Sequence, residues 1–349
     1  MAASGHEVIF AVVDLSSIRH RRKWGKHYYV RDGIEVYSID IPCGRIPKNI
    51  YYKIGIIALK YIYKTIEKSH GKPGITHAHF AEIGYITTKV SDFIGSPLVI
   101  TEHSSAVNKR DISPSLHKVV AYAYKKADSL IAVSKSLADN IRNNFGIEAK
   151  IVPNIVDLSI FTYNNEITSS IYNIVSTGNL IYGKRMDLLI KAFNVFQQSR
   201  KRVSLTIFGE GPERPKLEEL ISKLDLSQKV ILRGLCERGE IANKLHESNL
   251  FVLASQSETF GVSYVEALAT GVPVIATRCG GPESFVDDTN GILIPVDNLE
   301  ALVEAMKSLY KNIKKYDRKK ISDMAKEKFS PQMVTNKLIE IYEDVINDK

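Results

Sequence analysis

Short apolar runs alternate with helix-like stretches along most of this chain, and no other feature restricts its possible folds as strongly. Stretches such as Leu188–Arg200 and Glu213–Leu224 have helical periodicity. The alternation predicts an α/β fold in which parallel strands are covered by helices on both faces. The runs of strand length are Val8–Val13, Leu98–Ile100, Ser129–Val133, Ile151–Val152, Ile174–Ser176, Ser204–Phe208, Val230–Leu232, Leu250–Ala254 and Val274–Ala276.

The alternating pattern occurs in two blocks, separated by a polar stretch without periodicity at residues 160–171. We interpret this stretch as a linker between two Rossmann-like domains that face each other across a cleft. The first domain is assigned to residues 1–165 and the second to residues 166–330. The last helix, Gln332–Ile346, is expected to cross back, so that residues 331–349 complete the first domain. A chain of 349 residues is long enough for two domains.

The composition excludes several classes of protein. Because 44% of the residues are hydrophobic and 25% are charged, disordered, collagen-like and coiled-coil classes are excluded. No apolar run reaches the roughly 18 residues of a membrane-spanning helix, and the first residues lack the pattern of a signal peptide. The three cysteines, Cys43, Cys236 and Cys279, have neither zinc nor redox spacing, which favours a reducing cytoplasm.

The net charge of +8 is concentrated in the first half of the chain. Residues 1–170 contain 22 Lys and Arg against 15 Asp and Glu, and residues 19–31 contain six fixed positive charges and no acid. Lys53, Lys60 and Lys64 share one face of a predicted helix. We expect this half to contact an anionic membrane surface, with a solvated loop and an ordinary helix as the alternative. No nucleic-acid-binding module is recognisable, so nucleic acid is not an expected partner.

The motif SETFGVSYVEALATGVPV, at residues 257–274, indicates the chemistry. It follows a predicted strand and opens a helix, whose first N–H groups would bind phosphate. Two carboxylates, Glu258 and Glu266, are unfavourable beside an anion unless they accept hydrogen bonds from sugar hydroxyls. A nucleotide sugar has hydroxyls at both ends and a diphosphate between them, so it satisfies both requirements.

The E-x7-E spacing of this motif, followed by A-x3-G-x-P-V, resembles the retaining family-4 glycosyltransferases (glycosyl transferases group 1) of GT-B fold. The resemblance is to members that build bacterial cell-envelope polysaccharides and exopolysaccharides, and it extends from about residue 5 to residue 349. Further segments match the family in order: ITHAHF at 75–80, VITEHSS at 99–105, VPNIVD at 152–157, STGNLIYGKR at 176–185, FGEGP at 208–212 and CGGPE at 279–283.

The resemblance implies roles for residues of the second half. Lys184 would neutralise the donor diphosphate, Glu258 would contact the transferred sugar, and Glu266 would hold the ribose. A surface lysine and solvated acids at a helix start are the alternatives. The family often has arginine where this chain has Asn179, and we expect Arg185 to compensate. The other implied donor-binding residues are Gly178, Gly209, Phe260, Gly261, Val262 and Glu283, the last of which has helix capping as its alternative.

In the first half, the resemblance places His103 near the reaction centre, as a catalytic residue together with Lys184 and Glu258. His77 and His79 are two residues apart, so on a strand both point to one face. We favour His79 as an acceptor-side residue because it is nearer than His77 to the carboxyl end of that strand. Structural histidines are the alternative for all three positions, and Glu102 is expected to be structural.

The resemblance also implies the reaction and its surroundings. The sugar would move with retention of its anomeric configuration to a glycan or lipid-linked glycan acceptor, at the cytoplasmic face of the plasma membrane. Retaining hydrolases use two carboxyl groups, but no first-half carboxylate is a convincing nucleophile, so the donor phosphate oxygen would take the acceptor proton. No D-x-D motif occurs, so neither a metal nor another cofactor is expected.

The beginning of the chain, Gly5–Phe10, resembles the second strand of the family rather than its first. About 35 to 40 residues of the family pattern are therefore expected to be absent. The first sheet would lack a central strand, which would leave Val8–Val13 with an unpaired edge. A misplaced start codon, a cloned fragment and a degraded gene are the alternatives. A nucleotide-sugar epimerase of GT-B fold and an inactive donor-binding remnant are the competing functions.

Overall fold

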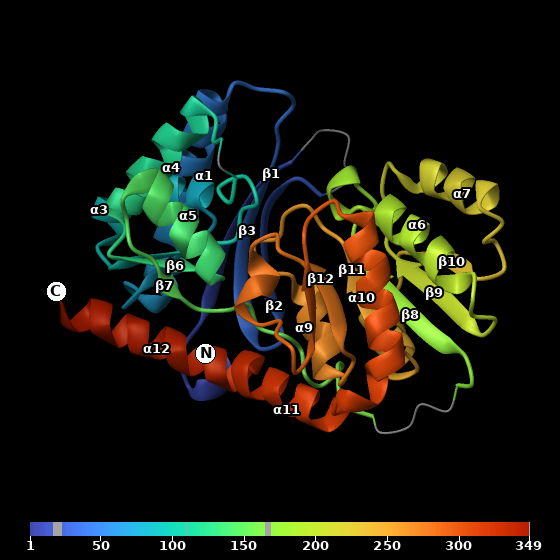
Figure 1. Ribbon diagram of the computed structural model, residues 1–349. Helices are drawn as coiled ribbons and strands as arrows, with labels where there is room; N and C mark the ends of the chain where they lie inside the picture. Colours follow the sequence, from blue (N-terminus) through green and yellow to red (C-terminus); the bar gives the residue numbers. More distant parts are fainter. Residues whose placement is uncertain (17–22, 110, 165–168, 349) are drawn as a thin grey trace. The chain divides into compact units, whose positions relative to one another are not determined.

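The computed structural model describes residues 1–16, 23–109, 111–164 and 169–348, which divide into two compact units. Unit 1 comprises residues 1–132, 141–150 and 337–349, and unit 2 comprises residues 133–140 and 151–336. Both contain the strands and helices of an α/β fold (Figure 1). Arg19, Arg21 and Arg22 of the predicted basic segment, and residues 165–168 of the predicted linker, lie outside the described residues.

Unit 1 contains two separate sheets, one of three strands in the order β1-β3-β2 and one of four in the order β4-β5-β6-β7. The strands are β1 (Ile9–Ser16), β2 (Gly25–Arg31), β3 (Ile34–Pro42), β4 (Thr76–His79), β5 (Leu98–Glu102), β6 (Ser129–Ala132) and β7 (Lys150–Ile151). The helices are η1 (Ala2–Ser4), α1 (Lys48–His70), α2 (Ala81–Thr88), α3 (Ser91–Ile94) and α4 (Pro114–Lys126). Two more are shared with unit 2: α5 (Lys135–Phe145) and α12 (Pro331–Asn347).

Strand β1 lies at the edge of its sheet, where it pairs in parallel with β3. Among the described residues, β1 therefore pairs on one side only, in agreement with the predicted unpaired edge. One face of the sheet packs on α1, through a cluster that includes Ile39, Ala58 and Ile62. On the other face, Phe10 is 48% exposed and Val12 is 37% exposed, although strands of a parallel sheet are usually buried on both faces.

Unit 2 contains one parallel six-stranded sheet in the order β10-β9-β8-β11-β12-β13. The strands are β8 (Tyr172–Thr177), β9 (Val203–Phe208), β10 (Val230–Gly234), β11 (Leu250–Leu253), β12 (Val274–Thr277) and β13 (Gly291–Ile294). The helices are η2 (Tyr182–Lys184), α6 (Met186–Gln197), α7 (Arg214–Lys223), α8 (Arg238–His246), α9 (Val262–Ala269), η3 (Gly281–Ser284), α10 (Leu299–Asn312), η4 (Ile313–Lys315) and α11 (Arg318–Phe329).

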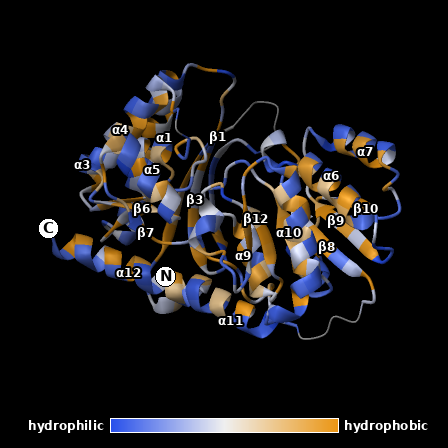
Figure 2. Ribbon diagram, viewed as in Figure 1, coloured by the Kyte–Doolittle hydropathy of each residue, from blue (hydrophilic) through white to orange (hydrophobic). Residues whose placement is uncertain are grey.

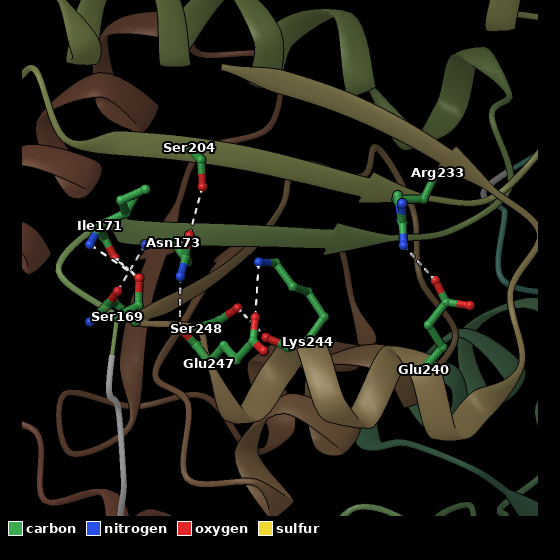
Figure 3. Close-up of polar contacts among 10 residues, drawn as sticks. Ser169, Ile171, Asn173, Ser204, Arg233, Glu240, Lys244, Glu247 and Ser248 are labelled. Carbon is green, nitrogen blue, oxygen red and sulfur yellow. Dashed lines mark hydrogen bonds and ion pairs between the residues drawn. The ribbon is translucent and has the colours of Figure 1, made fainter. Parts of the chain in front are cut away.

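The chemistry of these segments explains their positions. Strands β11 and β12 are buried throughout and largely hydrophobic, whereas the helices around the sheet alternate between polar and apolar residues (Figure 2). Asn173 joins the start of β8 to two neighbours: it accepts a hydrogen bond from Ser204 on β9 at 2.7 Å and donates one to the carbonyl of Glu247 at 3.0 Å (Figure 3). None of the described helices is both long enough and apolar enough to cross a membrane.

The strands expected from the apolar runs are all present, within three residues at their ends. The predicted helices also form, and Ser134 accepts a hydrogen bond from the amide of Leu137 at the start of α5. The unit boundary near residue 150 differs from the expected one at 165. The reason is that residues beyond 150 pack into unit 2: Phe161 is fully buried, and the amide of Val156 bonds to the carbonyl of Phe329 at 3.3 Å.

Candidate functional site

The strand order of unit 2 reverses direction between β8 and β11, which lie side by side at the centre of the sheet. In open parallel sheets, ligands bind beyond the carboxyl ends of the strands at such a switch point. The loop after β8 carries Lys184 and the loop after β11 carries Glu258. The amide of Gln256 bonds to the carbonyl of Gly183 at 2.8 Å, so the backbones of the two loops are joined.

Lys184 and Glu258 form an ion pair at this switch point. The Lys184 ammonium donates to Oε1 of Glu258 at 2.6 Å, and the Ser255 hydroxyl donates to the same oxygen at 2.7 Å. The Glu258 side chain is 10% exposed and that of Lys184 is 23% exposed. The sequence predicted a role for each residue but not their contact. A cation and a carboxylate placed together can bind a ligand that carries both phosphate and hydroxyl groups.

Helix α9 begins next to this pair, with Gly261 as its N-cap in the left-handed region at φ 93°. The amides at a helix N-terminus lack acceptors within the helix, so they can bind an anion. Phe260 is buried, and Gly281 packs so closely on its backbone that a Cβ there would lie 2.4 Å from the Phe260 carbonyl oxygen. The predicted amides of Phe260, Gly261 and Val262 therefore belong to a tightly packed turn.

The two loops after β8 and β9 also approach closely at their glycines. Gly178 has φ 159°, and a Cβ on Gly209 would lie 2.0 Å from the Gly178 carbonyl oxygen. The amide of Gly178 in turn bonds to the carbonyl of Phe208 at 3.0 Å. Asn179, which follows Gly178, is exposed. Close backbone packing of this kind keeps side chains out of the end of the sheet, where a ligand would approach.

Arg185 forms ion pairs with two carboxylates. Its Nε donates to Asp187 at 3.0 Å, and its guanidinium also pairs with Asp297. Only 12% of the side chain is exposed. Because two carboxylates already neutralise the guanidinium, this arrangement weighs against our expectation that Arg185 replaces the cation missing at Asn179. Hydrogen bonds that Arg185 donates to the Asp187 carboxylate raise the pKa of Arg185 above its usual value.

The remaining predicted donor-side acids have one observed contact each. Glu266, on α9, accepts a hydrogen bond from Arg238 at 2.7 Å. Glu283 accepts one from the amide of Gly280 at 3.0 Å, so it makes the contact expected of a capping residue for η3. The sequence analysis missed Arg238, because nothing in its spacing connects it with Glu266.

In unit 1, three histidines stack at the carboxyl ends of β4 and β5. His77 and His79 lie with ring centroids 4.5 Å apart, as expected for residues on one face of a strand. His79 Nδ1 is 3.0 Å from His103 Nε2, within hydrogen-bond distance. His77 hydrogen-bonds through its two nitrogens to Tyr342 of α12 and to Thr101. Burial, together with the two neighbouring imidazoles, lowers the pKa of His77 to about 3, so its ring is neutral near pH 7.

Glu102 fixes the backbone that carries His79 and His103. Its carboxylate is completely buried and accepts four hydrogen bonds, from the amides of Ala81, His103 and Ser104 and from the hydroxyl of Tyr124 at 2.6 Å. The expectation that Glu102 is structural agrees with these contacts. A carboxylate with four donors has no lone pair left to attack a substrate, so this residue is unsuited to act as a nucleophile.

Comparison with known proteins identifies the family. The family model of glycosyl transferases group 1 matches residues 165–328, and that of glycosyltransferase family 4 matches residues 1–160. The two halves of the chain belong to these glycosyltransferase families. The chain is 31% identical over 261 residues to TuaC of Bacillus subtilis (strain 168), which is named for teichuronic acid biosynthesis. That match covers 70% of the chain and 63% of TuaC, so the chain spans less than two thirds of this relative.

Solved structures show the same fold. Sucrose-phosphate synthase from Thermosynechococcus elongatus matches with a TM-score of 0.82 at 18% identity, covering 100% of the present chain and 91% of the synthase. HepE from Anabaena, solved in complex with UDP, matches with a TM-score of 0.74 at 18% identity, covering 89% and 86%. The expected GT-B fold with two Rossmann-like domains is therefore confirmed.

Proposed function

We propose that this protein transfers a sugar, with retention, from a nucleotide-diphosphate sugar to a precursor of a cell-envelope polysaccharide or exopolysaccharide. The observation that carries the proposal is the Lys184–Glu258 pair at the switch point of the unit 2 sheet, beside the N-terminus of α9. The name of TuaC supports the class of product, and the UDP bound to HepE supports the class of donor.

Each part of the donor site has a role in the proposed reaction. The Lys184 ammonium and the amides at the start of α9 stabilise the negative charge that grows on the departing diphosphate. Glu258 accepts hydrogen bonds from the transferred sugar, and Glu266 accepts them from the ribose. Binding the diphosphate draws Lys184 towards phosphate and leaves Glu258 able to accept hydroxyl hydrogens instead.

In the proposed reaction, retention does not use a protein nucleophile. The acceptor hydroxyl oxygen forms a bond to the anomeric carbon on the face from which the diphosphate leaves. The bond between that carbon and the phosphate oxygen breaks, and the acceptor proton moves to the leaving phosphate oxygen. Glu102, the buried carboxylate beside His103, supports this route because hydrogen bonds occupy it fully. His79 and His103 serve the acceptor side.

We also propose that the transfer needs no metal ion. The charge of the diphosphate is met instead by Lys184 and by the helix N-terminus. Addition of a chelator is expected to leave the initial rate unchanged. A rate that falls with the chelator and returns with Mg²⁺ or Mn²⁺ would refute this part of the proposal alone.

The acceptor is proposed to be lipid-linked and to be reached at the inner face of the plasma membrane. The α1 basic face, which consists of Lys53, Ile57, Lys60, Tyr61 and Lys64, supports this. Ile57 is 70% exposed and Tyr61 is 46% exposed between the three exposed lysines. Apolar and aromatic side chains beside lysines fit an anionic bilayer surface, in which the apolar groups enter and the ammonium groups meet lipid phosphates.

Vesicle flotation tests the membrane contact. The protein is expected to float with vesicles that contain phosphatidylglycerol and not with vesicles of phosphatidylcholine alone. K60E/K64E should abolish flotation, whereas K216E/K223E, on exposed positions of α7, should preserve it. Equal binding to both kinds of vesicle, or equal loss in both variants, would refute the assigned surface.

The transfer itself is tested with a panel of nucleotide sugars and a lipid extract as the acceptor source. The expected product is a glycolipid, and NMR of the anomeric proton should show the donor's configuration. A free epimerised nucleotide sugar, formed without acceptor, would identify an epimerase instead. Binding of the nucleotide without any transfer would identify the donor-binding remnant.

A further inference from the structure

Arg238 is the first residue of α8, and it reaches across to Glu266 on α9. Its NH2 nitrogen donates to Oε1 of Glu266 at 2.7 Å. The two ends of the contact differ in exposure, since 52% of the Arg238 side chain is exposed but only 13% of Glu266. Glu266 is therefore a nearly buried carboxylate with an accessible cation beside it.

The position of Arg238 is fixed by a second contact. Its guanidinium carbon lies 5.2 Å from the centre of the Phe161 ring, and Phe161 is completely buried. Asp157 lies in the same neighbourhood: hydrogen bonds from Ser159 lower its pKa, and the charge of Arg238 lowers it further. An arginine held by an aromatic ring and flanked by acids is oriented, and it loses less freedom when it binds.

Burial acts against the ionised form of Glu266. It raises the pKa of the carboxyl above its usual value, while the positive charge of Arg238 lowers it. Among the described titratable groups, Arg238 from α8 is the one whose charge acts on Glu266, and Asp157 acts in turn on Arg238. A carboxyl that became protonated would lose acceptor capacity towards hydroxyl groups.

We propose that Arg238 is a positioning residue for the donor nucleotide, which keeps the Glu266 carboxylate ionised and oriented to accept hydrogen bonds from both ribose hydroxyls. This inference rests on the proposed function, in which Glu266 holds the ribose. The Arg238–Glu266 pair would then determine specificity for the ribose of the donor nucleotide, favouring ribonucleotides over 2′-deoxyribonucleotides.

The test measures calorimetrically the binding of UDP, ADP and GDP, and of the 2′-deoxy form of whichever binds best, between pH 5 and pH 8. In R238A, affinity for the ribonucleotide should fall about tenfold or more, and the preference over the deoxy form should shrink. Without the arginine, Glu266 takes up a proton at higher pH, so the loss of affinity on acidification should begin at higher pH. R238K should keep part of the wild-type affinity and part of the wild-type preference for the ribonucleotide.

The matched control is R233A. Arg233 also has 52% of its side chain exposed, and it pairs with Glu240 at 3.0 Å near the start of the same helix (Figure 3). R233A should keep wild-type affinity and pH dependence. E266Q gives a second variant in which the acid-dependent loss should disappear.

The possible failures are distinguishable. If the wild-type protein binds the nucleotide and R238A matches it in affinity, pH profile and ribose preference, the role of Arg238 is wrong and the proposed function stands. If R233A weakens nucleotide binding as much as R238A does, the loss of affinity comes from the lower positive charge of the protein in general. The inference is then also overturned. If the wild-type protein binds no nucleoside diphosphate, both the inference and the proposed function fail.

Discussion

Lys184 and Glu258 are 74 residues apart in the chain, yet the ammonium and the carboxylate meet at 2.6 Å where the order of the unit 2 sheet reverses. Each follows one of two neighbouring central strands, β8 and β11, so the topology of a doubly wound sheet brings them together. A diphosphate and a sugar hydroxyl would compete for the two members of this pair.

Removal of the Lys184 charge should affect the reaction far more than stability. Lys184→Met is expected to lower the initial rate of transfer at least about a hundredfold, because it removes the positive charge that would stabilise the departing diphosphate. Lys191→Met is the control, since Lys191 is exposed and pairs at 3.3 Å with Asp187. Equal rates for the two variants, measured with saturating donor, would contradict this prediction.

The turn that joins the glycines after β8 and β9 should tolerate no side chain. Gly209→Ala is expected to cost about 3 kcal/mol of unfolding free energy or more, because its Cβ would overlap the Gly178 carbonyl oxygen and its φ is +131°. Gly239→Ala, within α8, has nothing within 4 Å of the new Cβ and should stabilise by up to about 1 kcal/mol. Urea denaturation compares the two, and a Gly209→Ala protein as stable as wild type would show that the turn is looser than described.

Substitution of Glu102 should lower stability more than substitution of Tyr124, the residue whose hydroxyl group donates to it. Glu102→Gln replaces one accepting oxygen with the NH2 group of a side-chain amide, which faces backbone amide donors. The substitution is therefore expected to lower the free energy of unfolding by about 3 kcal/mol. Tyr124→Phe removes a single hydrogen bond and should cost about 1 kcal/mol. Thermal denaturation of both variants checks the order, and the reverse order would mean that the amides do not depend on the carboxylate.

His77 should make stability depend on pH. Its pKa is lowered by burial to about 3, while in the unfolded chain it lies near 6.5, so the unfolded state binds the proton first as the pH falls. Stability is therefore lost between pH 6.5 and pH 3, by up to about 1.4 kcal/mol per pH unit for this group. His77→Asn lacks the titration, so its unfolding free energy should fall less steeply over pH 6.5–4.5. Parallel curves for the two proteins would rule out this contribution.

The sequence predicted most strands because buried parallel strands are rich in apolar residues, and β11 is apolar throughout. It missed β2, β3 and β13; β2 is largely exposed, whereas β3 is buried or half-buried along most of its length. The signal was nevertheless present, since Asp32 and Gly33, at φ 52° and 76°, form the Asp-Gly turn of a hairpin. The contact between Arg238 and Glu266 could not be predicted, because it joins the start of α8 to the middle of α9 through side chains whose separation in sequence carries no periodic signal.

Helix α12 begins among residues of unit 2 and ends among residues of unit 1, where Tyr342 contacts His77. A gene divided once near residue 150 would therefore not encode one unit per fragment, because the first product would lack its final helical segment. Split-protein experiments on this chain need either a third peptide or a circularly permuted gene that places residues 337–349 before residue 1. The main segment of unit 2, by contrast, is continuous, and a fragment that starts near residue 151 and stops near residue 336 contains it.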